Sequence, residues 1–188
     1  MAEAVERRSW WKVALVAVVA IELLGSASGL LSNSGYGNPW FDSLRKPDFM
    51  PPGWAFGVVW PILYALLGVA LATILVEPSS PRRQAALTFF FIQLVLNFAW
   101  SPIFFAAHDI TTAKIVIFVM AATAAAAAGQ FLRLRKTAGL LMVPYLLWLI
   151  FGAFALREIG KAVADRAENN AAIIKSCVEQ LNHKGAKP

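Results

Sequence analysis

One stretch of the sequence, from Pro52 to Val76, is PGWAFGVVWPILYALLGVALATILV. It contains no charged residue, and it exceeds the roughly 20 residues that a helix needs to cross the hydrocarbon core of a bilayer. Lipid offers no hydrogen-bond partner to free backbone groups, so such a stretch must be helical. It therefore predicts a membrane-spanning helix.

The rest of the chain repeats this pattern. Four further apolar tracts lie between short clusters of charge: Val13 to Leu31, Gln84 to Ala107, Ile115 to Leu132 and Thr137 to Leu156. Of the 188 residues, 59% are hydrophobic and 15% are charged, and the mean hydropathy is +0.60. We predict an all-α integral membrane bundle of five helices over residues 13–156, between an N-terminal segment (1–12) and a polar tail (157–188). This composition excludes large soluble-enzyme architectures.

The charged residues predict the orientation. Most Lys and Arg residues close to a span lie on the side of the membrane that carries the N-terminus, side A, which predicts a cytoplasmic N-terminus in a bacterial cell membrane. The net charge of +6 is placed to meet lipid head groups, so nucleic acid is not an expected partner. The single cysteine, Cys177, and both histidines lie outside the apolar tracts, so we expect no metal site.

The tryptophans are unevenly distributed. Trp10 and Trp11 fit an interfacial belt beside Lys12. The other five converge on the opposite half of the bundle, side B: Trp40, Trp54, Trp60, Trp100 and Trp148. The first loop, residues 32–51, is too rich in Gly and Pro for a helix but carries aromatic rings. We therefore expect a lid over an aromatic cavity.

Polar residues within the spans allow two interpretations. Gln93, Asn97 and Trp100 follow a spacing of four and three and share one helical face, which either contacts a ligand or only ties helices together. Glu22 is the one carboxylate inside a span. We expect it to be neutral and hydrogen-bonded to a neighbouring helix, so that Glu22→Gln leaves ligand binding almost unchanged.

Three internal prolines, Pro61, Pro102 and Pro144, predict bent helices that leave space between them. Small residues predict close helix contacts, within the bundle or in a homodimer: Gly25, Gly29, Ala121, Ala125 and Gly129.

The tail carries a weakly apolar stripe at alternating spacings of four and three: Val163, Ala167, Asn170, Ile174, Cys177 and Leu181. It fits an amphipathic helix on the membrane or against a partner, or a frayed solvated tail.

Three segments carry a family resemblance: KPDFMPPGWAFGVVWPILY (46–64), QLVLNFAWSPIFF (93–105) and VPYLLW (143–148). They are similar to the signature segments of the TspO/MBR family, the tryptophan-rich sensory and translocator proteins. The resemblance implies a dimeric five-helix bundle with a ligand pocket under the first loop. The ligand-binding residues it implies are Trp40, Phe49, Trp54, Phe56, Trp60, Tyr64, Asn97, Trp100, Tyr145 and Trp148.

The implied ligand is a porphyrin, such as protoporphyrin IX or haem, with no obligatory cofactor and no catalytic residue. A planar ring could stack on Trp faces while its carboxylates reach the amides and the loop residues Arg45 and Lys46. The leading hypothesis is a membrane receptor or carrier with a role in tetrapyrrole or stress regulation. The alternatives are an enzyme-like protein in which bound porphyrin is degraded in light, and a small secondary transporter that uses Glu22.

Overall fold

The computed structural model describes residues 2–185, with side chains from Trp10 to Gln180. Its elements are α1 (Ala2–Leu31), α2 (Pro39–Ser43), α3 (Gly53–Leu75), α4 (Pro81–Ser101), the π-helical turn η1 (Pro102–Ala106), α5 (Ile110–Leu134), α6 (Lys136–Leu141) and α7 (Val143–Gly185). Five helical segments are long and apolar enough to cross a membrane: Trp10–Leu31, Gly53–Leu75, Pro81–Ala106, Ile110–Leu134 and Lys136–Gln180. The predicted all-α bundle of five spans is confirmed.

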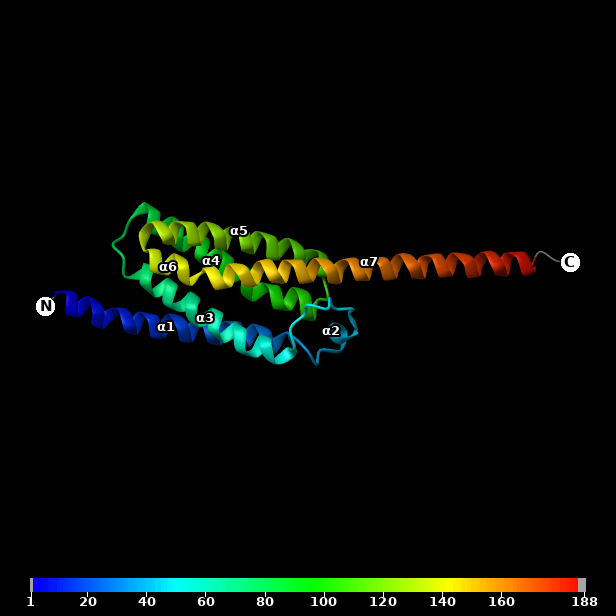
Figure 1. Cartoon of the computed structure of the whole chain (residues 1–188), viewed down its shortest axis with the longest axis horizontal. Helices are drawn as coiled ribbons and strands as arrows, with labels where there is room; N and C mark the ends of the chain where they lie inside the picture. Colours follow the sequence, from blue (N-terminus) through cyan, green and yellow to red (C-terminus); the bar gives the residue numbers. More distant parts are fainter. Residues whose placement is uncertain (1, 186–188) are drawn as a thin grey trace.

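The long helices run side by side, and the two chain ends point away from opposite ends of the bundle (Figure 1). α1 packs along α3, and α4 packs along α5. On α5, Ala124 and Ala127 are completely buried, so the two helices approach closely, and Phe90 stacks on Phe131 with ring centroids 5.5 Å apart. Small side chains and stacked rings together form the core away from α2.

Polar residues close the helix ends. Arg83 donates to the carbonyls of Ile74 (2.9 Å) and Leu75 (2.8 Å) in the last turn of α3. Asp109 caps α5 by accepting from the backbone N–H of Thr112 (2.9 Å) and from its hydroxyl (2.6 Å). These bonds favour the carboxylate and lower the pKa of Asp109 below its ordinary value.

The three prolines have different effects. Pro61 lies inside the continuous helix α3, whereas Pro102 begins the π-helical turn that ends the third span. Pro144 is the second residue of α7, where a backbone N–H would have no helical partner. The last span is therefore divided between α6 and α7 at Met142.

The first loop folds onto the bundle, as predicted, but it is not without a helix. Asn38 caps α2 by accepting from Phe41 N–H (3.1 Å), and its amide donates to the Phe105 carbonyl (3.3 Å). Phe41 is buried against Phe104 and Phe105. The short helix α2 has a local cause. The Asn38-Pro39 pair starts a helical turn, since Asn is a strong N-cap and Pro fits the first helical position.

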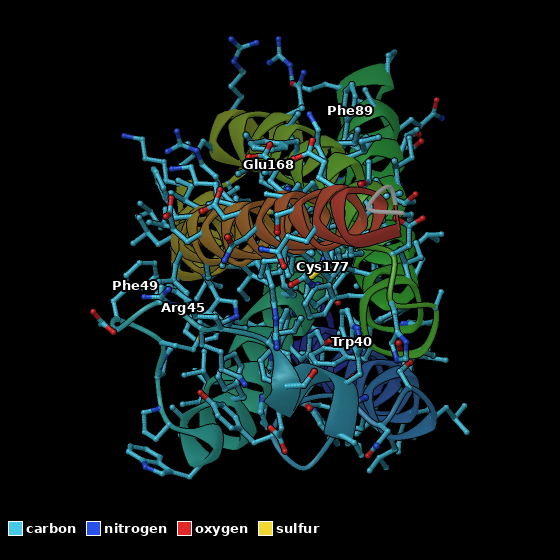
Figure 2. The ribbon with its side chains drawn as sticks, turned by 90° about the vertical axis from the view of Figure 1, so that its right-hand side faces the viewer. Trp40, Arg45, Phe49, Phe89, Glu168 and Cys177 are labelled. Atoms are coloured by element: carbon cyan, nitrogen blue, oxygen red, sulfur yellow. The ribbon has the colours of Figure 1, made fainter. Side chains whose placement is uncertain are left out.

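α7 extends far beyond the bundle as one helix (Figure 1). Every side chain from Val163 to Gln180 is exposed, and Glu168 and Cys177 point to opposite sides of the helix (Figure 2). The described part of the tail is therefore helical and not frayed, and its contact with the membrane or with a partner stays a prediction. The last residue of the predicted stripe, Leu181, lies outside the described side chains.

Candidate ligand-binding site

A cavity of about 520 Å³ lies in the half of the bundle next to α2. Its walls come from α1, α3, α4, η1, α5 and α7, and Phe41 and Met50 of the first loop contribute at one end. The predicted cavity beneath the first loop is confirmed.

One wall of the cavity is aromatic. Trp148 of α7 stands edge-on to Trp60 of α3, with centroids 6.4 Å apart and planes at 84°. Phe56 meets the same Trp148 ring at 5.7 Å and 72°, and Phe151 lies 5.3 Å from it. These rings come from two helices that touch each other little, so they cover the space between them. Such a wall suits a flat apolar ligand.

The cavity has a polar inner end. The Tyr64 hydroxyl donates to Asn97 Oδ1 (3.0 Å), and Asn97 Nδ2 donates to the Tyr145 hydroxyl (3.1 Å). Tyr64 and Asn97 line the cavity, whereas Tyr145 is completely buried behind them. This chain of hydrogen bonds joins α3, α4 and α7, and it gives partners to polar side chains that are buried in the apolar interior of the bundle.

One face of α1 forms another wall. Glu22, Gly25, Ser26 and Gly29 all line the cavity, at the spacing that places residues on one side of a helix. A β-carbon at Gly25 would collide with the Tyr64 ring, whereas at Gly29 it would have no neighbour nearer than 4.0 Å. Glu22 forms no hydrogen bond or ion pair within the described residues, so the expected bond to a neighbouring helix is wrong.

Six of the ten predicted ligand-binding residues line this cavity: Phe56, Trp60, Tyr64, Asn97, Trp100 and Trp148. Trp100 is held in place by its indole N–H, which donates to the Ala113 carbonyl (3.1 Å), and by stacking on Phe104 at 5.0 Å. The shared face of Asn97 and Trp100 on α4 therefore points into the cavity.

The other four predicted residues do not line the cavity. Trp40 stacks on His108, with centroids 4.4 Å apart, and borders a separate shallow pocket. Phe49 lies at the edge of the loop near Arg45 (Figure 2), with its ring 5.8 Å from Phe151. Tyr145 is the buried partner of Asn97.

Trp54 is 73% exposed. It precedes Trp60 by six residues, which places the two indoles on different faces of α3. The predicted convergence of five tryptophans on one cavity is thus wrong for Trp40 and Trp54 and holds for the other three.

The basic loop residues are not in the cavity lining. Lys46 donates to the Phe41 carbonyl (2.7 Å) and lies over the Phe41 ring at 4.4 Å. Arg45 is exposed at the outer edge of the loop (Figure 2). Lys46 therefore stabilises the fold of the first loop.

Sequence reasoning missed several lining residues. Ile117 and Met120 of α5 and Ser26 of α1 contact the cavity. An apolar side chain on a membrane helix can face either a cavity or lipid, and the sequence does not distinguish the two. Ile117 and Met120 could therefore not have been predicted as lining residues. Ser26 could have been found, because its spacing from Glu22 is the same as that between Gln93 and Asn97.

Gln93 does not tie helices together. It is completely buried, and neither of its amide atoms has a partner among the described residues. The interpretation of Gln93 as an interhelical tie is therefore wrong, and only Asn97 has that role. Within the described residues no three His, Cys, Asp or Glu side chains are placed to hold a metal ion.

The predicted small-residue contacts divide into internal and external ones. Gly25 packs inside the bundle against Tyr64, and Gly29 lines the cavity. Ala121 packs partly against the core. Ala125 and Gly129 of α5 are exposed, and a β-carbon at Gly129 would meet nothing.

Comparison with known proteins agrees with this architecture. Residues 15–161 match the family described as TspO/MBR. The chain is 38% identical to a tryptophan-rich sensory protein of Cereibacter sphaeroides, over 58% of this chain and 67% of the relative. It is 34% identical to a translocator protein of Ovis aries, over 73% and 85% of the two chains. It is 33% identical to a tryptophan-rich protein TspO of Archaeoglobus fulgidus, over 74% and 89%.

Proposed function

Since the chain belongs to the TspO/MBR family, we propose that this multi-pass membrane protein is a receptor or carrier for a planar apolar ligand, with a porphyrin as the leading candidate. The observation that carries the proposal is the aromatic wall of Trp60 and Trp148 next to the polar group of Tyr64 and Asn97. The names of the relatives, sensory and translocator protein, fit a role in sensing or carriage.

The size and composition of the cavity support the proposal. Ligand pockets are typically about 300–1,000 Å³, mainly apolar, with few fixed polar groups. The cavity, at about 520 Å³, falls within that range. The carboxylates of a porphyrin would point toward the loop, because the inner end already carries the carboxyl group of Glu22.

Titration of the purified protein with protoporphyrin IX in the dark tests the proposal. Bound porphyrin should quench the fluorescence of Trp60, Trp100 and Trp148, while Trp10 and Trp11 stay emissive. Trp148→Phe should weaken binding about fivefold, through loss of roughly 1 kcal/mol of ring contact. Trp10→Phe and Trp54→Phe are the matched controls and should leave affinity unchanged. Equal effects at all three positions would exclude the cavity as the binding site.

The same samples separate the alternatives. If illumination in air yields a modified porphyrin that requires Trp148, the protein supports degradation with dissolved oxygen as oxidant. Binding without product supports a receptor or carrier. The transporter alternative is weaker, because five spans do not form the paired repeats of secondary transporters and Glu22 is the only carboxylate in the described lining of the cavity.

A further inference from the structure

We propose that the cavity selects ligands with a protonated amine, which binds Glu22 while the ligand's flat apolar part contacts Trp60 and Trp148. This inference rests on the proposed function, and it adds a second class of planar ligand to the porphyrins, which carry carboxylates and no such amine. It follows from the position of one carboxyl group, its lack of a partner and the open space beside it.

Glu22 is a carboxyl group at membrane depth whose side chain borders the cavity. Ionisable groups in membrane spans are costly unless they face water, an opposite charge or a ligand. No Lys, Arg or His belongs to the described lining of the cavity, and Glu22 forms no hydrogen bond or ion pair within residues 10–180. No described residue of the protein supplies the opposite charge, and a ligand cation would supply it.

Glu22 shares its face of α1 with other residues that line the cavity. Ser26 and Gly29 lie one and two turns further along the same face, and both line the cavity. A β-carbon at Gly29 would have no neighbour nearer than 4.0 Å, so no side chain packs tightly against this part of the face. The Tyr64 ring packs against Gly25, in the turn next to Glu22, and its hydroxyl stays bonded to Asn97.

Glu22 is the one ionisable acid in the described lining of the cavity, and the groups at its inner end are already paired. The Asn97 amide uses both of its side-chain groups within the protein, one to Tyr64 and one to Tyr145. Trp100 uses its indole N–H on the Ala113 carbonyl. A ligand cation would thus meet one carboxyl group, a few neutral hydroxyl and amide groups such as those of Ser26 and Ser34, and the faces of Trp60 and Trp148, which attract cations.

Two fluorescent probes of nearly the same shape test this inference. 1-Pyrenemethylamine is protonated at neutral pH, whereas 1-pyrenemethanol is neutral. The wild-type protein should bind the amine about tenfold more tightly, the difference between a charge-assisted and a neutral hydrogen bond. Glu22→Gln should reduce amine affinity to that of the alcohol and leave alcohol binding unchanged. Retained alcohol binding also shows that the variant is folded.

The matched control is Glu168→Gln, which removes the same charge from the exposed tail (Figure 2) and should preserve the preference for the amine. Ser26→Lys provides a second test that keeps Glu22, because a lysine four residues later supplies an internal cation and should abolish the preference. Equal binding of both probes by the wild type, or an unchanged preference in Glu22→Gln, would overturn the inference and leave the cavity intact. Binding of neither probe by the wild type would overturn the binding function itself.

Discussion

Asn97 bonds two tyrosine hydroxyls from different helices, and its replacement should destabilise the bundle. Asn97→Leu leaves the hydroxyls of Tyr64 and Tyr145 without their amide partner in a largely buried site. We expect a loss of about 1–2 kcal/mol, measured as a lower thermal unfolding temperature in detergent.

A triple variant provides the control. Asn97→Leu combined with Tyr64→Phe and Tyr145→Phe removes all the polar groups of this network together, so no group is left unpaired. Its unfolding temperature should recover most of the loss. If Asn97→Leu alone unfolds at the wild-type temperature, the network does not stabilise the bundle.

Single site residues could be predicted from the sequence where their spacing from another polar or aromatic residue placed both on one face of a helix. Asn97 and Trp100 share a face, and both line the cavity. Trp54 was assigned by its place in a motif, but six residues separate it from Trp60, and it points outward. The position of Trp40 could not be predicted, because its ring stacks on His108 of a different loop and helical spacing says nothing about contacts between loops.

The helix α5 has two faces of small residues with different roles. Ala124 and Ala127 are buried against the neighbouring helix, whereas Ala125 and Gly129 are exposed. We propose that the exposed face is the homodimer contact. Ala125→Leu with Gly129→Leu should shift cross-linking in membranes toward monomer, with an unchanged unfolding temperature, because neither site contacts the core.

Gly25→Leu is the contrasting change on α1. Its side chain would collide with Tyr64, so the unfolding temperature should fall. A shift to monomer without any loss of stability would place Gly25 in the dimer contact instead. Unchanged cross-linking in the α5 variant would remove the proposed dimer face.

Among the elements, the long helices were predictable and the short ones were not. An apolar tract of about 20 residues has only one stable form in lipid, so five spans follow from composition. α2 and η1 depend on local hydrogen bonds and on packing, as the contact between Asn38 and Phe105 shows. The length of α7 was left open, because its exposed part has no packing that a hydrophobic pattern could reveal.

For the whole molecule, the single cysteine provides a test of orientation. Cys177 is exposed on α7, at the opposite end of the bundle from the N-terminus (Figure 1). If the N-terminus is cytoplasmic, as the basic residues predict, a membrane-impermeant maleimide should label Cys177 in intact cells.

Cys177→Ser with Arg82→Cys is the matched control, because Arg82 is the second residue of α4, next to the turn at the other end of the bundle. This variant should be labelled only after the membrane is permeabilised. The opposite result for the pair would reverse the orientation and place the mouth of the cavity on the cytoplasmic side.

The length of α7 has a mechanical consequence. Trp148, Ala155 and Ile159 border the cavity, and the same helix continues without a break to Gly185, about 39 Å further at the usual rise per residue. A pivot of about 10° at the cavity wall would move the far end by roughly 7 Å over that length. A displacement at the cavity wall too small to reshape the bundle would thus become a movement of several ångströms at the far end of α7.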